Sequence, residues 1–177
     1  MYTNIIAAEL NNKALGLYQQ GKYTEAEYYY KQALELRLNN ISDPCVPPQS
    51  IALSQNALGE LYLSMGRLDE AEKLLHSAAS YRELHEDYDR AYTRDNLGRL
   101  YEMKGDMKAA REWRSKGAAK NEMMCSYEEC QKTRSLGFIS FKELQLCSRC
   151  KCIYYCGRKC QKLDYKRHKQ YCKPAVA

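Results

Sequence analysis

Metal-ligand side chains crowd one stretch of this 177-residue chain. Eight of its nine cysteines and one of its three histidines lie within 48 residues. They are Cys125, Cys130, Cys147, Cys150, Cys152, Cys156, Cys160, His168 and Cys172. Soft thiolates with one imidazole at such short spacings are the ligands that tetrahedral Zn²⁺ takes at structural sites. Eight ligands close two sites, so the sequence predicts two zinc ions.

Four of these side chains form two pairs with a spacing of four residues. The pairs are Cys156 with Cys160 and His168 with Cys172. On a helix this spacing puts both side chains on one face, where they can hold one ion. If residues 156–172 are mostly helical, a rise of about 1.5 Å per residue separates the ends by roughly 24 Å, so the pairs serve different ions. The upstream pairs are Cys125 with Cys130 and Cys147 with Cys150. Spacing alone leaves open which upstream pair completes which site.

Three motifs carry a family resemblance. They are Cys147-Ser-Arg-Cys150, Tyr155-Cys156-Gly-Arg-Lys-Cys160-Gln161 and Asp164-Tyr165-Lys-Arg-His168-Lys169-Gln-Tyr-Cys172. Together they resemble the MYND-type zinc finger, in which the ligand pairs are cross-braced. The resemblance implies one zinc on Cys125, Cys130, Cys156 and Cys160 and a second zinc on Cys147, Cys150, His168 and Cys172. This module would span residues 121–177.

The chain departs from the family's pattern in three places. Four residues separate Cys125 from Cys130 where two are commoner, the segment from Cys130 to Cys147 is long, and the usual tryptophan is Tyr165. The ninth candidate, Cys152, is interpreted as a small residue at the start of a strand, and its replacement of a ligand is the alternative. In MYND-type fingers, proline-containing peptides dock near the C-terminal helix, which implies peptide contacts at Gln161 and Tyr165.

Residues 1–120 contain a repeated pattern that ends its first half with glycine. Its three copies centre on Gly21, Gly66 and Gly105, each following leucine and tyrosine and preceding a segment rich in alanine. This pattern resembles the tetratricopeptide repeat, and its spacings of 45 and 39 residues resemble the elongated repeats of kinesin light chain. We therefore predict a mainly α fold, a solenoid of three helical hairpins followed by a small cross-braced module with two zinc ions.

Two connecting segments complete the predicted architecture. Ser42–Gln49 contains three prolines, which disfavour helix interiors, and is predicted to be an exposed loop. Ala118–Met124 lacks the composition of a flexible linker, so helix is expected to run almost into Cys125, with the zinc module capping the last repeat. We expect the repeats to form a groove that binds extended peptides or partner helices. Asn12 and Asn96 lie where groove asparagines of the kinesin-light-chain type can bind a peptide backbone.

Composition limits the other function classes. The chain has no run of 18 apolar residues and no N-terminal pattern of a signal peptide, so no membrane association is expected. For the same reason an intracellular setting, in the cytoplasm or the nucleus, is expected, and there the reducing conditions and the odd cysteine count favour metal binding over disulfides. Residues 121–177 carry 12 lysines and arginines against 5 acidic residues, which makes a basic zinc module that binds nucleic acid a competing interpretation.

The pattern favours a binding protein over an enzyme. Catalytic zinc keeps one open coordination position, whereas both predicted sites have four protein ligands. The chain has no metalloprotease helix, phosphate loop, nucleophile elbow or dinucleotide motif. We therefore predict a non-catalytic, zinc-binding adaptor that mediates protein–protein interaction, with protein or peptide partners that include proline-containing segments. A zinc module that only caps and stabilises the repeats is the remaining alternative.

Overall fold

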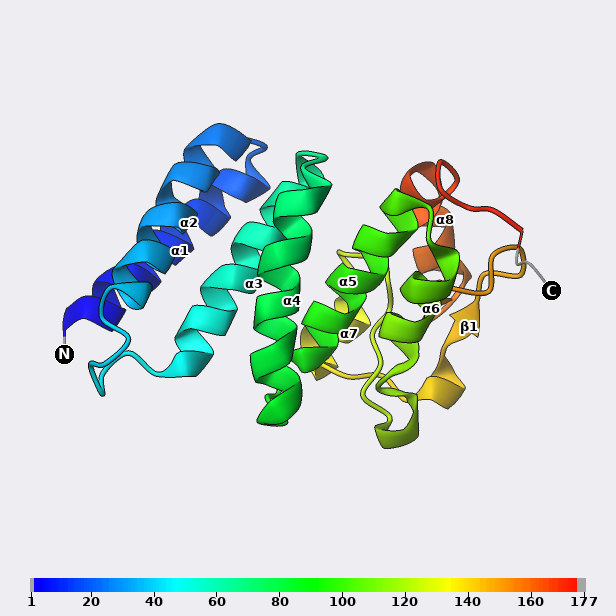
Figure 1. Ribbon diagram of the computed structural model, residues 1–177. Helices are drawn as coiled ribbons and strands as arrows, with labels where there is room; N and C mark the ends of the chain where they lie inside the picture. Colours follow the sequence, from blue (N-terminus) through cyan, green and yellow to red (C-terminus); the bar gives the residue numbers. More distant parts are fainter. Residues whose placement is uncertain (1, 175–177) are drawn as a thin grey trace. The chain divides into compact units, whose positions relative to one another are not determined.

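A computed structural model describes residues 2–174 (Figure 1). Its internal contacts divide the chain into two compact units, one ending at Arg90 and the other beginning at Ala91. The first unit contains α1 (Tyr2–Gln19), α2 (Tyr23–Leu38), α3 (Pro48–Ser64) and α4 (Leu68–Leu84). The predicted mainly α fold, with helical hairpins followed by a cysteine-rich module, is confirmed.

The first unit consists of two helical hairpins. α1 packs on α2, α3 packs on α4, and α2 contacts α3 (Figure 1). Each hairpin turns at a glycine in the left-handed region, Gly21 with φ 75° and Gly66 with φ 74°, a conformation that costs glycine little. α3 and α4 can approach closely at Gly59 because glycine has no Cβ. A Cβ at this position would lie 2.8 Å from Cγ of Leu75. Small residues therefore set the spacing within the hairpin.

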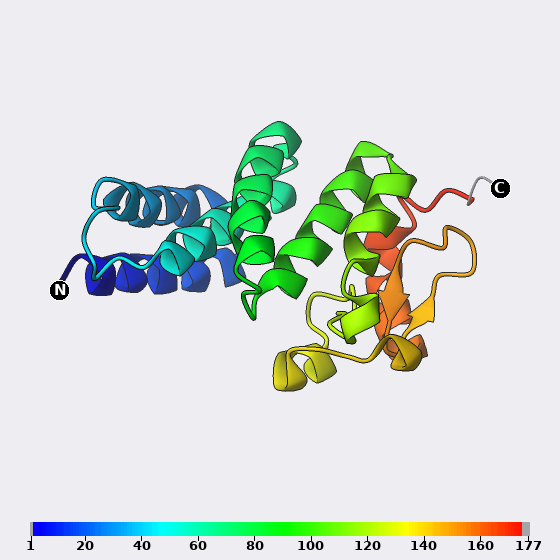
Figure 2. The same ribbon diagram turned by 60° about the horizontal axis from the view of Figure 1, so that its bottom comes forward.

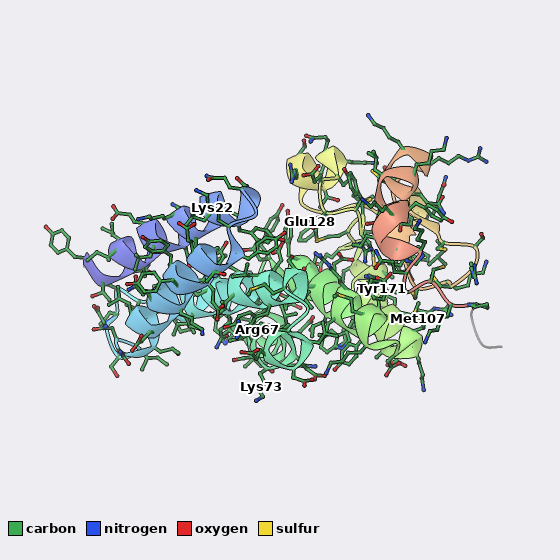
Figure 3. The ribbon with its side chains drawn as sticks, turned by 90° about the horizontal axis from the view of Figure 1, so that it is seen from above. Lys22, Arg67, Lys73, Met107, Glu128 and Tyr171 are labelled. Carbon is green, nitrogen blue, oxygen red and sulfur yellow. The ribbon has the colours of Figure 1, made fainter. Side chains whose placement is uncertain are left out.

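A polar cluster ties the two hairpins of this unit together. Glu27 of α2 accepts hydrogen bonds from Tyr62 of α3 at 3.0 Å and from Arg67 at 2.7 Å. Arg67 lies in the turn between α3 and α4, where Figure 3 labels it. A carboxylate with several charged and neutral donors is held more firmly than an exposed ion pair. The cluster therefore fixes how the first hairpin meets the second.

The connection between the hairpins differs from the predicted loop at its end. α3 begins at Pro48, so Pro48 and Gln49 are helical, and Val46 is buried with 2% of its surface exposed. Proline suits the first position of a helix because its missing N–H has no intrahelical partner there. The loop interpretation holds for residues 42–47, where Cys45 is exposed.

The second unit combines the third hairpin with the cysteine-rich segment. Its elements are α5 (Arg90–Lys104), α6 (Met107–Ser115), η1 (Ala118–Lys120), α7 (Gln131–Leu136), η2 (Phe141–Glu143), β1 (Gln145–Leu146), β2 (Tyr154–Tyr155) and α8 (Arg158–His168). β1 and β2 are antiparallel, with Gln145 opposite Tyr155, and Figure 2 shows them beside α8, which contacts β2. The boundary near residue 120 between repeats and finger stays a prediction.

The segment between α6 and Cys125 is not the continuous helix that the sequence predicts. α6 ends at Ser115, a 3-10 turn follows, and Asn121 adopts a left-handed φ of 57°. The amide of Glu122 then donates to the carbonyl of Gly117 at 2.9 Å, which closes a tight turn. Asparagine tolerates this conformation better than most residues, so the helix stops and the chain reverses. Between residues 2 and 174, no helix is long and apolar enough to span a membrane.

Candidate metal centre

The first group of ligands gathers four cysteine sulfurs. The Sγ atoms of Cys125, Cys130, Cys156 and Cys160 all lie within 4.8 Å of one another. The Sγ of Cys156 is 3.5 Å from those of Cys130 and Cys160. Tetrahedral Zn²⁺ with bonds of about 2.3 Å places two ligand sulfurs about 3.8 Å apart. The spacing of these sulfurs therefore fits one zinc ion.

The second group contains three cysteine sulfurs and one imidazole. Its members are Cys147, Cys150, His168 and Cys172. The Sγ atoms of Cys147 and Cys172 are 3.8 Å apart, and Nε2 of His168 lies 3.4 Å from Sγ of Cys147 and 3.6 Å from Sγ of Cys150. A tetrahedral zinc with three sulfurs and one nitrogen requires separations of about 3.5 to 3.8 Å. Nε2 is thus the ligand nitrogen that the geometry offers.

The hairpin of β1 and β2 positions the middle ligands. The amide of Cys147 donates to the carbonyl of Ile153 at 2.9 Å, and the amide of Lys151 donates back to the carbonyl of Cys147 at 3.0 Å. Lys151 has a left-handed φ of 55°, so the turn after Cys150 is tight. Cys147 and Cys150 therefore meet on one side of the turn, as a Cys-x-x-Cys site requires.

The two ligand pairs with a spacing of four residues lie at the two ends of α8, and each pair has one member outside the helix. Cys156 precedes the helix and Cys160 is in its first turn, while His168 is its last residue. Cys172 follows in a turn closed by its own amide, which donates to the carbonyl of His168 at 3.0 Å. The predicted helix over 156–172 is therefore too long at both ends, although each pair still meets.

Models of known families match three parts of the chain. A tetratricopeptide repeat model matches residues 50–114, a second tetratricopeptide repeat model matches residues 7–40, and a MYND finger model matches residues 125–172. The chain contains tetratricopeptide repeats and a MYND finger. Both predicted families are thereby confirmed. The likeness to kinesin light chain stays a prediction.

A curated protein also resembles part of the chain. It is a SET and MYND domain-containing protein from Dictyostelium discoideum, 44% identical over 55 residues. These residues make up 31% of this chain and 10% of that protein, so the chain spans about a tenth of the length of this relative. The MYND finger and its two clusters are compatible with zinc binding. Repeats and fingers of these families are consistent with protein–protein interaction.

Cys152 lies inside the MYND finger but outside both ligand groups. It is fully buried, two residues before the start of β2, and its thiol donates to Sγ of Cys150 at 3.4 Å. This hydrogen bond lowers the pKa of Cys150, although burial opposes the shift. A lower pKa favours the thiolate, the form that binds metal. The interpretation of Cys152 as a small residue at the start of a strand, with replacement of a ligand as the alternative, stays a prediction.

Sequence reasoning missed a buried acidic residue next to the second group. Glu102 of α5 has none of its surface exposed, and its Oε1 lies 2.6 Å from Nδ1 of His168. Burial alone would raise the pKa of Glu102, but Arg114, the hydrogen bond with His168 and Arg167 lower it to about 2. The carboxylate is therefore ionised, and the third hairpin contributes it to the surroundings of a candidate metal ligand.

Arginines from two elements surround this carboxylate. Arg114 of α6 donates to Oε2 of Glu102 at 2.9 Å and also binds Asp95 at 3.1 Å. Arg167 of α8 donates to the same Oε2 at 3.2 Å and holds Asp164 through two hydrogen bonds of 2.7 Å. Buried charges persist only when each one has such partners. The sequence contains one signal of this buried charge. Arg114 occupies the repeat position that is Tyr30 in the first copy and Leu75 in the second, so a charged residue stands where the other copies have a large, mostly apolar one.

The predicted peptide-contact residues fall in different places. Gln161 and Tyr165 line one pocket of about 270 Å³ on α8, together with Arg158 and Lys162. Tyr165 is 61% exposed, so its ring is available. Asn12 lies exposed on α1 in the first unit, whereas Asn96 lies half-buried on α5 in the second. The structure brings the finger pair together, and the two asparagines belong to separate units.

Proposed function

We propose that the chain is a non-catalytic adaptor that binds two zinc ions in its MYND finger and holds protein partners. The observation that carries this proposal is the filling of both metal-ligand groups by four protein side chains at tetrahedral spacing. Such groups leave no coordination position for water or substrate, so bound zinc would supply structural cross-links between distant segments. An adaptor of this kind works in a reducing, intracellular setting, where the thiols stay free for metal.

The finger's partner is proposed to be a proline-containing peptide that also carries acidic residues. The pocket on α8 offers the ring of Tyr165 for stacking on proline and the amide of Gln161 for a peptide backbone. Arg158 and Lys162 line the pocket, and the exposed charged residues between residues 158 and 169 are all basic, namely Arg158, Lys159, Lys162, Lys166 and Lys169. In Figure 3 nitrogen-tipped side chains of α8 extend away from the ribbon. A basic rim selects acidic partners and speeds their association.

Peptide titration of the zinc-loaded, ¹⁵N-labelled full chain tests this proposal. A synthetic proline-rich peptide flanked by glutamates is expected to shift the amide signals of Gln161 and Tyr165, and Tyr165→Ala should weaken binding by about 10-fold. Leu163→Ala is the matched control, because Leu163 is 53% exposed on the same helix but does not line the pocket. Unchanged signals at both residues in the zinc-loaded protein would overturn the peptide proposal.

The basic rim also supports the competing proposal, nucleic-acid binding. Lysines on an exposed helix attract phosphate through a sequence-independent and salt-dependent interaction. Duplex DNA of mixed sequence is therefore titrated beside the peptide at physiological ionic strength. Tighter binding of the DNA, with an affinity that falls steeply as salt rises, would favour the nucleic-acid function over the adaptor.

A further inference from the structure

We propose that Glu102 of the third repeat hairpin is a positioning residue for the second zinc site. It holds the imidazole of His168 in the tautomer that keeps hydrogen on Nδ1 and leaves Nε2 free to bind the metal. The proposal rests on the zinc binding proposed above and adds a residue from outside the finger, on α5, to the metal centre.

The two nitrogens of His168 face different partners. Nδ1 lies 2.6 Å from Oε1 of Glu102, while Nε2 lies 3.4 and 3.6 Å from the sulfurs of Cys147 and Cys150. An ionised carboxylate only accepts hydrogen bonds, so it requires the proton on Nδ1. With its hydrogen on Nδ1, the imidazole offers Nε2 to a metal ion, and Nε2 faces the sulfurs. A carboxylate behind a metal-binding histidine also makes the imidazole a stronger ligand.

The two carboxylate oxygens of Glu102 have different partners. Oε1 is bound to the imidazole, whereas Oε2 accepts from both Arg114 and Arg167. Each arginine is held in turn by a second carboxylate, Arg114 by Asp95 and Arg167 by Asp164. The arginines therefore fix the carboxylate in a buried place, and the carboxylate fixes the ring. This order of contacts distinguishes a positioning role from an ion pair that only joins two helices.

Through Glu102, the hairpin of α5 and α6 supplies a hydrogen-bond acceptor to a metal ligand of the finger. His168 is 3% exposed and Glu102 is completely buried, so water does not replace the carboxylate as the acceptor for Nδ1–H. Residues 121–177 contain all eight candidate ligands but lack this acceptor. In a finger without α5 the acceptor for Nδ1–H would be mobile water instead of a fixed carboxylate, so the second site should hold its ion less firmly than in the full chain.

The test compares Glu102→Ala and Glu102→Gln in the full chain loaded with Zn²⁺ or ¹¹³Cd²⁺. Release of metal from the site with three sulfurs and one nitrogen is expected to be about 10- to 100-fold faster in Glu102→Ala. Glu102→Gln should fall between Ala and wild type, because an amide oxygen still accepts from Nδ1–H. Glu112→Gln is the matched control, since Glu112 is an exposed glutamate on α6 of the same hairpin.

Two further measurements separate positioning from a general loss of stability. Long-range ¹H–¹⁵N spectra should show His168 protonated at Nδ1 in wild type and a weakened or exchanging Nδ1–H signal in Glu102→Ala. In a His168→Cys background, which offers four sulfurs, the effect of Glu102→Ala on metal release should shrink to that of the control. Persistence of the full effect in that background, or a wild-type release rate in Glu102→Ala, would overturn the inference.

The same data distinguish this inference from the proposal on which it rests. If the wild-type chain binds no zinc under reducing conditions, the zinc-binding function itself fails. If the wild type binds two equivalents and both Glu102 variants keep wild-type release rates and tautomer signals, only the role of Glu102 fails.

Discussion

A Cβ atom at Gly98 would lie 2.5 Å from Cγ of Arg114. The side chain of Arg114 crosses α5 at this glycine on its way to Glu102, Asp95 and the carbonyl of Cys152. Because those contacts hold the guanidinium while the helix backbone holds the other end, the side chain has little room to move aside. Gly98→Ala is therefore expected to destabilise the second unit by about 1–3 kcal/mol. Urea denaturation followed by the fluorescence of Trp113, the only tryptophan in the sequence, measures the change.

Gly16→Ala is the matched control for this prediction. Gly16 lies within α1, and a Cβ there meets nothing within 4 Å. Alanine should therefore stabilise α1 by about 0.5–1 kcal/mol, because glycine loses more conformational entropy in a helix. Hydrogen exchange of the α1 amides gives the readout. Equal effects of the two substitutions would show that the crowding at Gly98 has no energetic weight.

Local spacing explains what the sequence could predict. The turn glycines and leucine–tyrosine pairs indicated helical hairpins, because each copy of a repeat has the same local structure and therefore the same residue pattern. The cysteines and His168 indicated a finger because metal ligands must recur at short separations. The structure brings together the same two groups of four that the resemblance implied.

Tertiary contacts explain what the sequence could not predict. Glu102 follows Tyr101 in an ordinary amphipathic helix, and its partner His168 is 66 residues away. Most glutamates in such helices face solvent, so no local pattern marks this one as buried. The sequence also did not predict where α8 begins and ends, because Cys156 and Cys172 are positioned by segments outside the helix. Burial and partners at long range decide both cases.

Removing zinc should loosen the third hairpin together with the finger. The cysteine-rich segment positions Arg167 and His168 against Glu102 of α5, and few large apolar residues there could hold the fold without metal. Treatment with a chelator under reducing conditions is expected to lower hydrogen-exchange protection in α5 and α6 by at least 10-fold. α1 to α4 contain no candidate ligand and should keep their protection. Unchanged protection of α5 would contradict the prediction.

Replacing Arg114 by leucine should cost far more than an ordinary surface substitution. Arg114 shows 2% side-chain exposure and pairs with Glu102 and Asp95, so its loss removes one of the two arginines that neutralise the fully buried carboxylate of Glu102. Breaking a buried pair in this way typically costs about 3–5 kcal/mol. Leucine is the residue that the second repeat carries at this position, Leu75, so a purely apolar core would accept it.

Thermal and urea unfolding of zinc-loaded Arg114→Leu, followed at Trp113, test this expectation. Lys108→Leu on the exposed side of α6 provides the comparison. If Arg114→Leu lowers the free energy of unfolding no more than Lys108→Leu does, the ion pairs of Arg114 with Glu102 and Asp95 contribute nothing to stability.

Acid should weaken the junction between the first two hairpins through Glu27. Burial opposes the shift, but Lys31, Arg67 and Tyr62 together lower the pKa of Glu27, whose side chain is 14% exposed. A carboxyl whose pKa is lowered by folding stabilises the fold above the unfolded value of about 4.3 and loses that contribution as pH falls through the lower folded value. Glu27→Gln should therefore destabilise the first unit by about 1 kcal/mol at pH 7. The difference from wild type should fade below about pH 4.

Hydrogen exchange of the α2 and α3 amides, compared between variant and wild type at each pH, isolates this effect. Zinc loss in acid does not confuse the comparison, because every candidate ligand lies in the second unit. Glu35→Gln, a substitution of an exposed glutamate on the same helix, is the matched control. A gap between Glu27→Gln and wild type that stays constant from pH 7 to pH 3 would mean that packing, and not the charge of Glu27, joins the two hairpins.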